Sequence, residues 1–173
     1  MEFESIAKKI RPSSTTETNI VEPRRQEERE EPDCLVMKIA TAQEANAEQL
    51  GIGVEISKAN HARFKWALVD RKLNSVIQNE AHAIKIALSK ALECQWSKVK
   101  VKVKSKQLIN ELQIGQGKDI ATIVLVEDIL SLASLFQLCS FCLDNTNDMD
   151  LCSNLSSYAL NIARDEKRIH SSP

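Results

Sequence analysis

Residues 98–103 read KVKVKV, and this strict alternation of lysine and valine constrains the 173-residue chain more than any other feature. Successive side chains of a β-strand point to opposite faces, so the pattern predicts a strand with valines on one face and lysines on the other. The valine face needs a core to pack against. Lysine is almost never fully buried, so the lysine face must stay open to water. The pattern therefore predicts a sheet with one packed face and one charged face.

Other periodic segments surround this strand and predict an α/β fold. An apolar stripe at helical spacing is strongest over residues 75–94, and a turn-rich segment between two alternating runs predicts a hairpin. The predicted strands are residues 34–40, 50–57, 62–69, 98–103 and 137–144, and the predicted helices are residues 75–94, 105–112, 120–136 and one that begins near residue 151. This order predicts a five-stranded mixed sheet, a three-strand antiparallel meander plus two parallel strands, with helices on both faces. The helix over 120–136 is apolar on nearly every side, which predicts that it is the buried one.

The two ends of the chain differ from this periodic middle. Residues 1–33 are dense in charge, contain prolines and carry almost no large apolar side chain. Such a segment cannot bury enough surface to offset the entropy lost on ordering. We therefore predict a disordered charged tail over residues 1–33, a folded domain over residues 34–166 and a second disordered tail over residues 167–173.

The overall composition excludes several classes of protein. Lys plus Arg is 23 and Asp plus Glu is 24, so the whole chain lacks the excess positive charge of a general nucleic-acid binder. No apolar run is long enough for a membrane helix, and the amino terminus lacks the apolar core of a secretory signal. The odd number of cysteines, five, favours reduced thiols. We expect an intracellular protein, nuclear or cytoplasmic, without a membrane partner.

The element order resembles that of the ribonuclease H-like fold, and four segments sharpen the resemblance to plant reverse-transcriptase-like ribonuclease H domains. The first-helix signature of that family fits Glu80–Leu88, EAHAIKIAL, at every defined position. The family's first-strand motif corresponds to Lys38–Gln43, KIATAQ, and its hairpin start corresponds to Gly51–Val54, GIGV. Its fourth-strand motif corresponds to Val101–Leu108, VKVKSKQL.

The resemblance implies hydrolysis of the RNA strand of an RNA–DNA hybrid by two Mg²⁺ ions held on four carboxylates. Glu80 carries the helix carboxylate, but the other three positions fall on Ala42, Lys104 and Asn154. One carboxylate cannot hold two divalent ions, so we expect no bound metal and no other cofactor. We also predict that Lys104 replaces the metal as the direct counter-ion of Glu80.

Three other acids leave a shifted metal site open as an alternative. Glu44 lies two residues beyond Ala42, and Asp148 and Asp150 precede the last predicted helix. A two-metal site tolerates little misplacement, which argues against this alternative.

The alternating lysines have two interpretations. Lys98, Lys100, Lys102 and Lys104 share one strand face and are suited to contact phosphates. They are equally suited to a solvated face or to an edge protected against aggregation. The leading functional hypothesis is a catalytically inactive, retroelement-derived ribonuclease H-like protein with weak binding of nucleic acid. The alternatives are an active metal-dependent hybrid ribonuclease and a structural or protein-interaction remnant.

Overall fold

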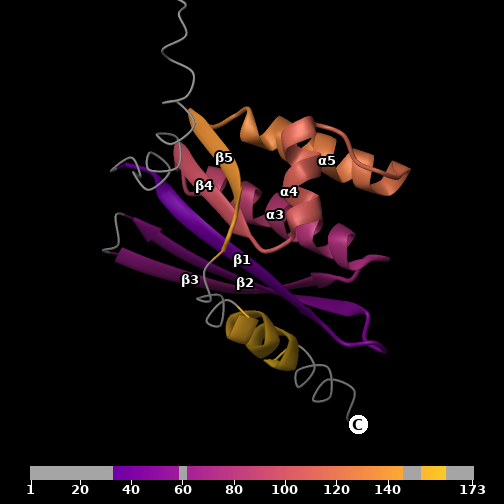
Figure 1. Ribbon diagram of the computed structural model, residues 1–173. Helices are drawn as coiled ribbons and strands as arrows, with labels where there is room; N and C mark the ends of the chain where they lie inside the picture. Colours follow the sequence, from indigo (N-terminus) through magenta and orange to yellow (C-terminus); the bar gives the residue numbers. More distant parts are fainter. Residues whose placement is uncertain (1–32, 59–61, 146–152, 163–173) are drawn as a thin grey trace, which may run out of the picture. The chain divides into compact units, whose positions relative to one another are not determined.

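The structure is a computed structural model that describes residues 33–58, 62–145 and 153–162 (Figure 1). Its centre is a five-stranded sheet in the order β3-β2-β1-β4-β5. The strands are β1 (Leu35–Gln43), β2 (Gln49–Lys58), β3 (Ala62–Arg71), β4 (Lys98–Val103) and β5 (Leu138–Leu143). β1, β2 and β3 pair antiparallel, whereas β4 pairs parallel with both β1 and β5. The predicted mixed sheet is confirmed. The tails predicted over 1–33 and 167–173 lie outside the described residues, apart from Asp33.

The helices that are labelled in Figure 1 cover one face of this sheet, and a further helix covers part of the other face. The labelled helices are α3 (Val76–Glu93), α4 (Lys106–Ile114) and α5 (Ile120–Ala133), and residues 153–162 form the further helix. Each labelled helix begins at a side chain that accepts a hydrogen bond from a free backbone N–H, which is the usual way to satisfy a helix start. These N-cap residues are Ser75, Ser105 and Asp119. Asp119, for example, accepts from the backbone N–H of Thr122 at 2.8 Å.

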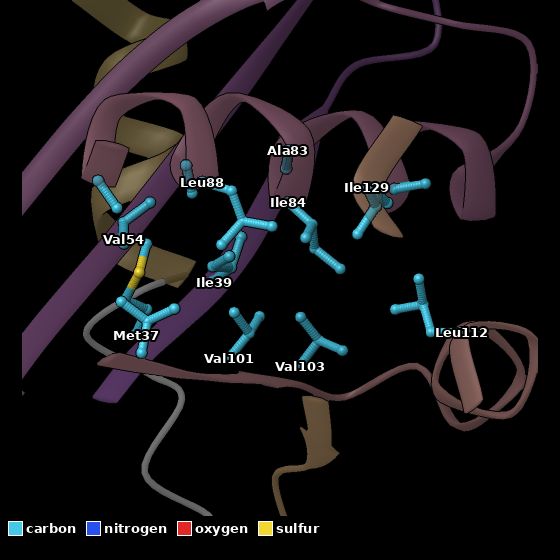
Figure 2. Close-up of a cluster of buried hydrophobic side chains, with 14 of the residues drawn as sticks. Met37, Ile39, Val54, Ala83, Ile84, Leu88, Val101, Val103, Leu112 and Ile129 are labelled. Carbon is cyan, nitrogen blue, oxygen red and sulfur yellow. The ribbon is translucent and has the colours of Figure 1, made fainter. Parts of the chain in front are cut away.

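The hydrophobic core lies between the sheet and the labelled helices. Met37, Val54 and Val101 project from three strands toward Ile84 and Leu88 of α3, and all five are fully buried (Figure 2). Burying side chains of this size stabilises the fold by about 1.5–3 kcal/mol each. Most of the apolar burial therefore lies on the helical face of the sheet.

The structure corrects the prediction that the helix over 120–136, apolar on nearly every side, is the buried one. In α5 only Thr122, Val126 and Ile129 are buried, whereas Ile120 is 81% exposed and Val124 is 50% exposed. The reason lies in the layering, because α5 packs mainly against α3 and has no further layer of described residues outside it. Hydropathy alone does not report which neighbours a helix has.

Among the described residues, no helix combines the length and apolar character needed to cross a membrane.

Candidate functional site

The positions singled out in the sequence gather at the carboxyl ends of the two central parallel strands. Ala42 is the next-to-last residue of β1, and Lys104 directly follows β4. Because β1 and β4 run parallel, both positions lie at the same edge of the sheet. Glu80 lies in the first half of α3, the helix that packs against β1. The fold therefore brings these three positions to one end of the sheet.

Glu80 is half-buried, and its side-chain partner is Ser105. Burial raises the pKa of the Glu80 carboxyl above its ordinary value, because a carboxylate loses hydration there. The hydrogen bond from the Ser105 hydroxyl acts in the opposite direction and lowers this pKa. Ser105 also accepts a hydrogen bond from the backbone N–H of Leu108 at 3.2 Å, as the N-cap of α4. One hydroxyl therefore links the start of α4 to the carboxylate of α3.

The predicted direct ion pair between Lys104 and Glu80 is not formed within 4.0 Å, although the structure describes both residues. The Lys104 side chain is exposed, and its neighbour Ser105 contacts Glu80 instead. Successive residues at a strand end point in different directions, so Lys104 and Ser105 cannot both turn toward α3. This detail depends on where β4 ends and α4 begins, which alternation alone does not settle.

A second polar link joins β1 to α3 beside Glu80, and the sequence analysis did not find it. The side-chain amide of Asn79 donates to the Gln43 side-chain oxygen at 2.5 Å, and its own oxygen accepts from the backbone N–H of Leu73 at 2.7 Å. Asn79 is buried, so these bonds satisfy an amide that would otherwise be costly to bury. Gln43 thus points toward α3, and alternation directs Ala42 to the opposite face.

Asn154 lies on that opposite face, in the first turn of the helix over 153–162, where its side chain is exposed. This helix passes over Gly51, the residue paired with Ala42 on the neighbouring strand. A Cβ atom on Gly51 would lie 2.1 Å from the Ser156 carbonyl oxygen, so only glycine permits this close approach. We call the four positions that correspond to the carboxylates implied by the resemblance the carried-over positions: Ala42, Glu80, Lys104 and Asn154. They lie at one end of the sheet and on both of its faces.

One further acid lies at this edge and was not a sequence candidate. Asp144 directly follows β5, and its backbone N–H donates to the Val103 carbonyl oxygen at 2.8 Å. This bond places Asp144 beside the end of β4, and its side chain is buried. An acid after a strand is common in loops, so no local pattern distinguishes it.

The four carried-over positions do not match the ligand set that two Mg²⁺ ions need. Mg²⁺ prefers several oxygen ligands at short distance, and the four carried-over positions supply one carboxylate, one amide, one methyl group and one ammonium group. Within residues 33–58, 62–145 and 153–162, no group of three His, Cys, Asp or Glu side chains is placed to hold a metal ion. The alternative ligand Glu44 is among these residues, whereas Asp148 and Asp150 lie outside the described residues.

The lysine face of β4 is present as the alternation predicts. Val99, Val101 and Val103 are buried on one side, and the lysines of β4 are half-buried on the other. We call Lys38, Lys98, Lys100 and Lys102 the lysine strip, because Lys38 of β1 lies in register with Lys102 and extends the row onto the next strand. The sequence analysis did not include Lys38 in this row, because only the pairing of β1 with β4 places it beside Lys102.

A charged row continues across the same face from the lysine strip. Glu55 of β2 lies opposite Lys38 on one side and opposite Lys65 of β3 on the other. Glu55 is only 7% exposed, and opposite charges on paired strands stabilise each other. Glu55 thus lies between Lys38 and Lys65, and the lysines of β4 lie beyond Lys38.

The mixed sheet and the helices on its two faces define a ribonuclease H-like domain. The described fold is similar to the N-terminal RNase H domain of a Mycobacterium tuberculosis protein, at 19% identity over 78% of this chain and 98% of that chain, with a TM-score of 0.62. It is also similar to RNase H1 from Halobacterium salinarum, at 15% identity over 75% of this chain and 98% of that chain, with a TM-score of 0.63.

The family assignment comes from the sequence itself. The reverse transcriptase-like family matches residues 39–153, the greater part of the chain, and the chain belongs to this family. A further structural likeness is LC11-RNase H1 from compost, solved in complex with an RNA/DNA hybrid, at 15% identity over 75% of this chain and 98% of that chain, with a TM-score of 0.64. No curated protein matches the chain.

Proposed function

We propose that the chain is a catalytically inactive ribonuclease H-like domain that binds an RNA–DNA hybrid without cleaving it. The observation that carries this proposal is the donor set at the carboxyl ends of β1 and β4. Glu80 is the one carboxylate among the four carried-over positions, and its side chain is hydrogen-bonded to Ser105. An exposed lysine follows β4 where a cation would need an anionic ligand. These features support loss of metal-dependent hydrolysis.

The lysine strip supports retention of binding. Its four ammonium groups lie on two neighbouring strands, and the backbone of a nucleic acid presents a row of phosphates to such a surface. LC11-RNase H1, which shares the fold, has been solved with an RNA/DNA hybrid. The net charge of −1 gives no general attraction for nucleic acid, so we expect weak binding that falls steeply with salt.

The proposal includes descent from a retroelement. The family match to reverse transcriptase-like proteins supports this origin. The fold likeness to the protease-reverse transcriptase of prototype foamy virus, with a TM-score of 0.53 over 75% of this chain and 21% of that chain, agrees with it.

A cleavage assay tests the catalytic part of the proposal. The full chain is incubated in excess with a labelled RNA–DNA hybrid in Mg²⁺ and then in Mn²⁺, next to a Glu80→Ala variant. We expect both proteins to leave the hybrid intact, because neither holds enough oxygen ligands for two ions. Cleavage by the natural chain that Glu80→Ala abolishes would restore the active hybrid ribonuclease.

A binding assay tests the lysine strip. Fluorescence anisotropy measures the affinity of the full chain for a blunt hybrid at low salt. Reversing two charges with Lys100→Glu and Lys102→Glu is expected to weaken binding about tenfold or more and to flatten its salt dependence. The control, Lys106→Glu with Lys118→Glu, makes the same charge change on exposed residues outside the strip. Equal weakening by both pairs would refute the assignment to the strip, and absence of binding would leave a structural remnant.

A further inference from the structure

An aromatic cluster lies at the end of the sheet opposite the candidate site. Trp66 of β3 and Trp96, which follows α3, stack with ring centroids 5.4 Å apart and planes 5° apart. The ring centroid of Phe64 lies 6.5 Å from that of Trp96, and Phe64 is 52% exposed. The Lys90 ammonium lies 5.3 Å from the centroid of the Trp66 ring, over its face. Aromatic faces and a cation are thus held together near the surface.

The backbone holds Trp96 in a fixed place. Gln95 adopts a positive φ of 63°, and the N–H groups of Gln95 and Trp96 donate to the carbonyl oxygens of Leu92 and Ala91 at 2.9 and 3.1 Å. This pattern is a Schellman motif, in which glycine usually occupies the left-handed position. A side chain there is disfavoured, so the chain accepts local strain where it positions Trp96 against Trp66.

A groove of about 360 Å³ opens beside this cluster. It is lined by Asp33, Leu35, Lys58, Gln95, Trp96 and Lys98, with Ser97 and Gln137 completing the wall. Lys58 is exposed at the end of β2, and Lys98 is both a wall of the groove and the first residue of the lysine strip. The groove therefore has an aromatic wall, Trp96, and two basic side chains in its lining. Its lining contains one acidic side chain, Asp33. We call it the Trp96 groove.

We propose that the Trp96 groove and the adjoining Phe64 ring bind a single-stranded segment of nucleic acid. An unpaired base stacks on the aromatic surface, and the neighbouring phosphates contact Lys58 and Lys98. Stacking needs an open base face, which a paired base inside a duplex does not offer, so the site selects single strands. Because Lys98 also belongs to the lysine strip, one backbone can pass from the groove to the strip. The inference rests on the proposed function only in that the ligand is again a nucleic acid.

The position of the tryptophans provides a direct readout. The chain contains two tryptophans, and both belong to this cluster. Tryptophan fluorescence therefore reports on this cluster alone, and Trp96 of the cluster lines the groove. Titration of the full chain with a twelve-residue oligothymidine or oligouridine is expected to quench this emission, while anisotropy measures affinity. The blunt hybrid, which has no unpaired base, is expected to bind without comparable quenching.

Variants separate stacking from general attraction. Phe64→Ala is expected to weaken single-strand binding about tenfold, which is the size of one lost stacking contact. Phe64→Leu keeps an apolar side chain on β3 but removes the aromatic face, so it should weaken binding similarly without loss of the fold. Lys58→Glu should weaken binding and reduce its salt dependence. The matched control is Tyr158→Ala, which removes an exposed aromatic ring from the helix over 153–162.

The outcomes distinguish this inference from the proposed function. Single-strand binding without quenching, or with an unchanged affinity in Phe64→Leu, overturns the Trp96 groove, even if hybrid binding remains sensitive to Lys100→Glu and Lys102→Glu. Single-strand binding with quenching, together with no hybrid binding, supports the groove and refutes the proposed function. Binding of neither ligand overturns both.

Discussion

The two faces of β4 have the same backbone but opposite roles. On the helical face, Val101 (Figure 2) and Val99 are fully buried in the core, whereas on the other face Lys100 and Lys102 remain half-buried. Stability depends on burial and packing, and neither requires particular groups at the candidate site. The comparison teaches that the core takes its contribution of β4 from the valine face and does not include the lysine face. Substitutions on the two faces should therefore have very different effects.

The largest contrast is expected between Val101→Ala and Lys100→Ala. Val101→Ala removes buried methyl groups and leaves a cavity, so it should lower the free energy of unfolding by about 2–3 kcal/mol. Lys100→Ala changes a half-buried charged side chain and should stay within about 0.5 kcal/mol of the natural chain. Urea unfolding followed by circular dichroism measures both. Similar losses from the two variants would refute the contrast between the faces.

Gly51→Ala tests whether the second face is also packed where the last helix crosses it. The new methyl group would collide with the Ser156 carbonyl oxygen, and the Leu160 side chain is also close. We expect a loss of about 1–3 kcal/mol and faster hydrogen exchange over residues 153–162. Gly53→Ala, in the same strand and on the same face, is the matched comparison. Normal exchange protection in Gly51→Ala would show that the helix does not need this close approach.

The smallest effect concerns Glu80 and depends on pH. Burial raises the pKa of Glu80 in the folded chain above the ordinary 4.5, so the unfolded chain loses this proton first as pH rises. Ionisation of Glu80 therefore lowers stability above about pH 4.5. Glu80→Gln should be more stable than the natural chain at pH 7, and the gap should close below about pH 4. Denaturant titrations at several pH values measure this gap.

The Ser105 hydroxyl provides a second variant for the same experiment. Ser105→Ala removes the group that favours the Glu80 carboxylate, and it should also cost about 1 kcal/mol as an N-cap. Without the hydroxyl, the pKa of Glu80 should rise further, so Glu80→Gln should stabilise the Ser105→Ala chain at pH 7 more than it stabilises the natural chain. If the extra stability of Glu80→Gln over its parent chain grew toward acidic pH, burial would not be raising the pKa of Glu80.

Much of the fold was predictable because its signals are local. Strict alternation marked β4, and the apolar stripe marked α3, since both patterns follow from the geometry of one element. The burial of α5 was not predictable in this way. Its apolar composition resembles that of a core helix, yet Ile120 and Val124 are exposed because no layer of described residues covers that side.

The candidate site was predictable only in part. The position of Glu80 in a helix signature and of Lys104 at a strand end placed both at one edge, as the structure has them. The expected direct ion pair between Lys104 and Glu80 is not formed. The next residue, Ser105, turns toward α3 and contacts Glu80 instead. The link from Gln43 to Asn79 joins residues from separate elements, and no spacing in the sequence announces it.

The sequence by itself determined the element order, the two-faced character of β4 and the chemistry available at the carried-over positions. These are properties of residue types and of short periodic patterns. Only the tertiary structure decided that Lys38 joins the lysine strip and that Phe64, Trp66 and Trp96 form one cluster. The physical reason is that strand pairing and helix packing bring together side chains distant in the chain, and local patterns do not encode those contacts.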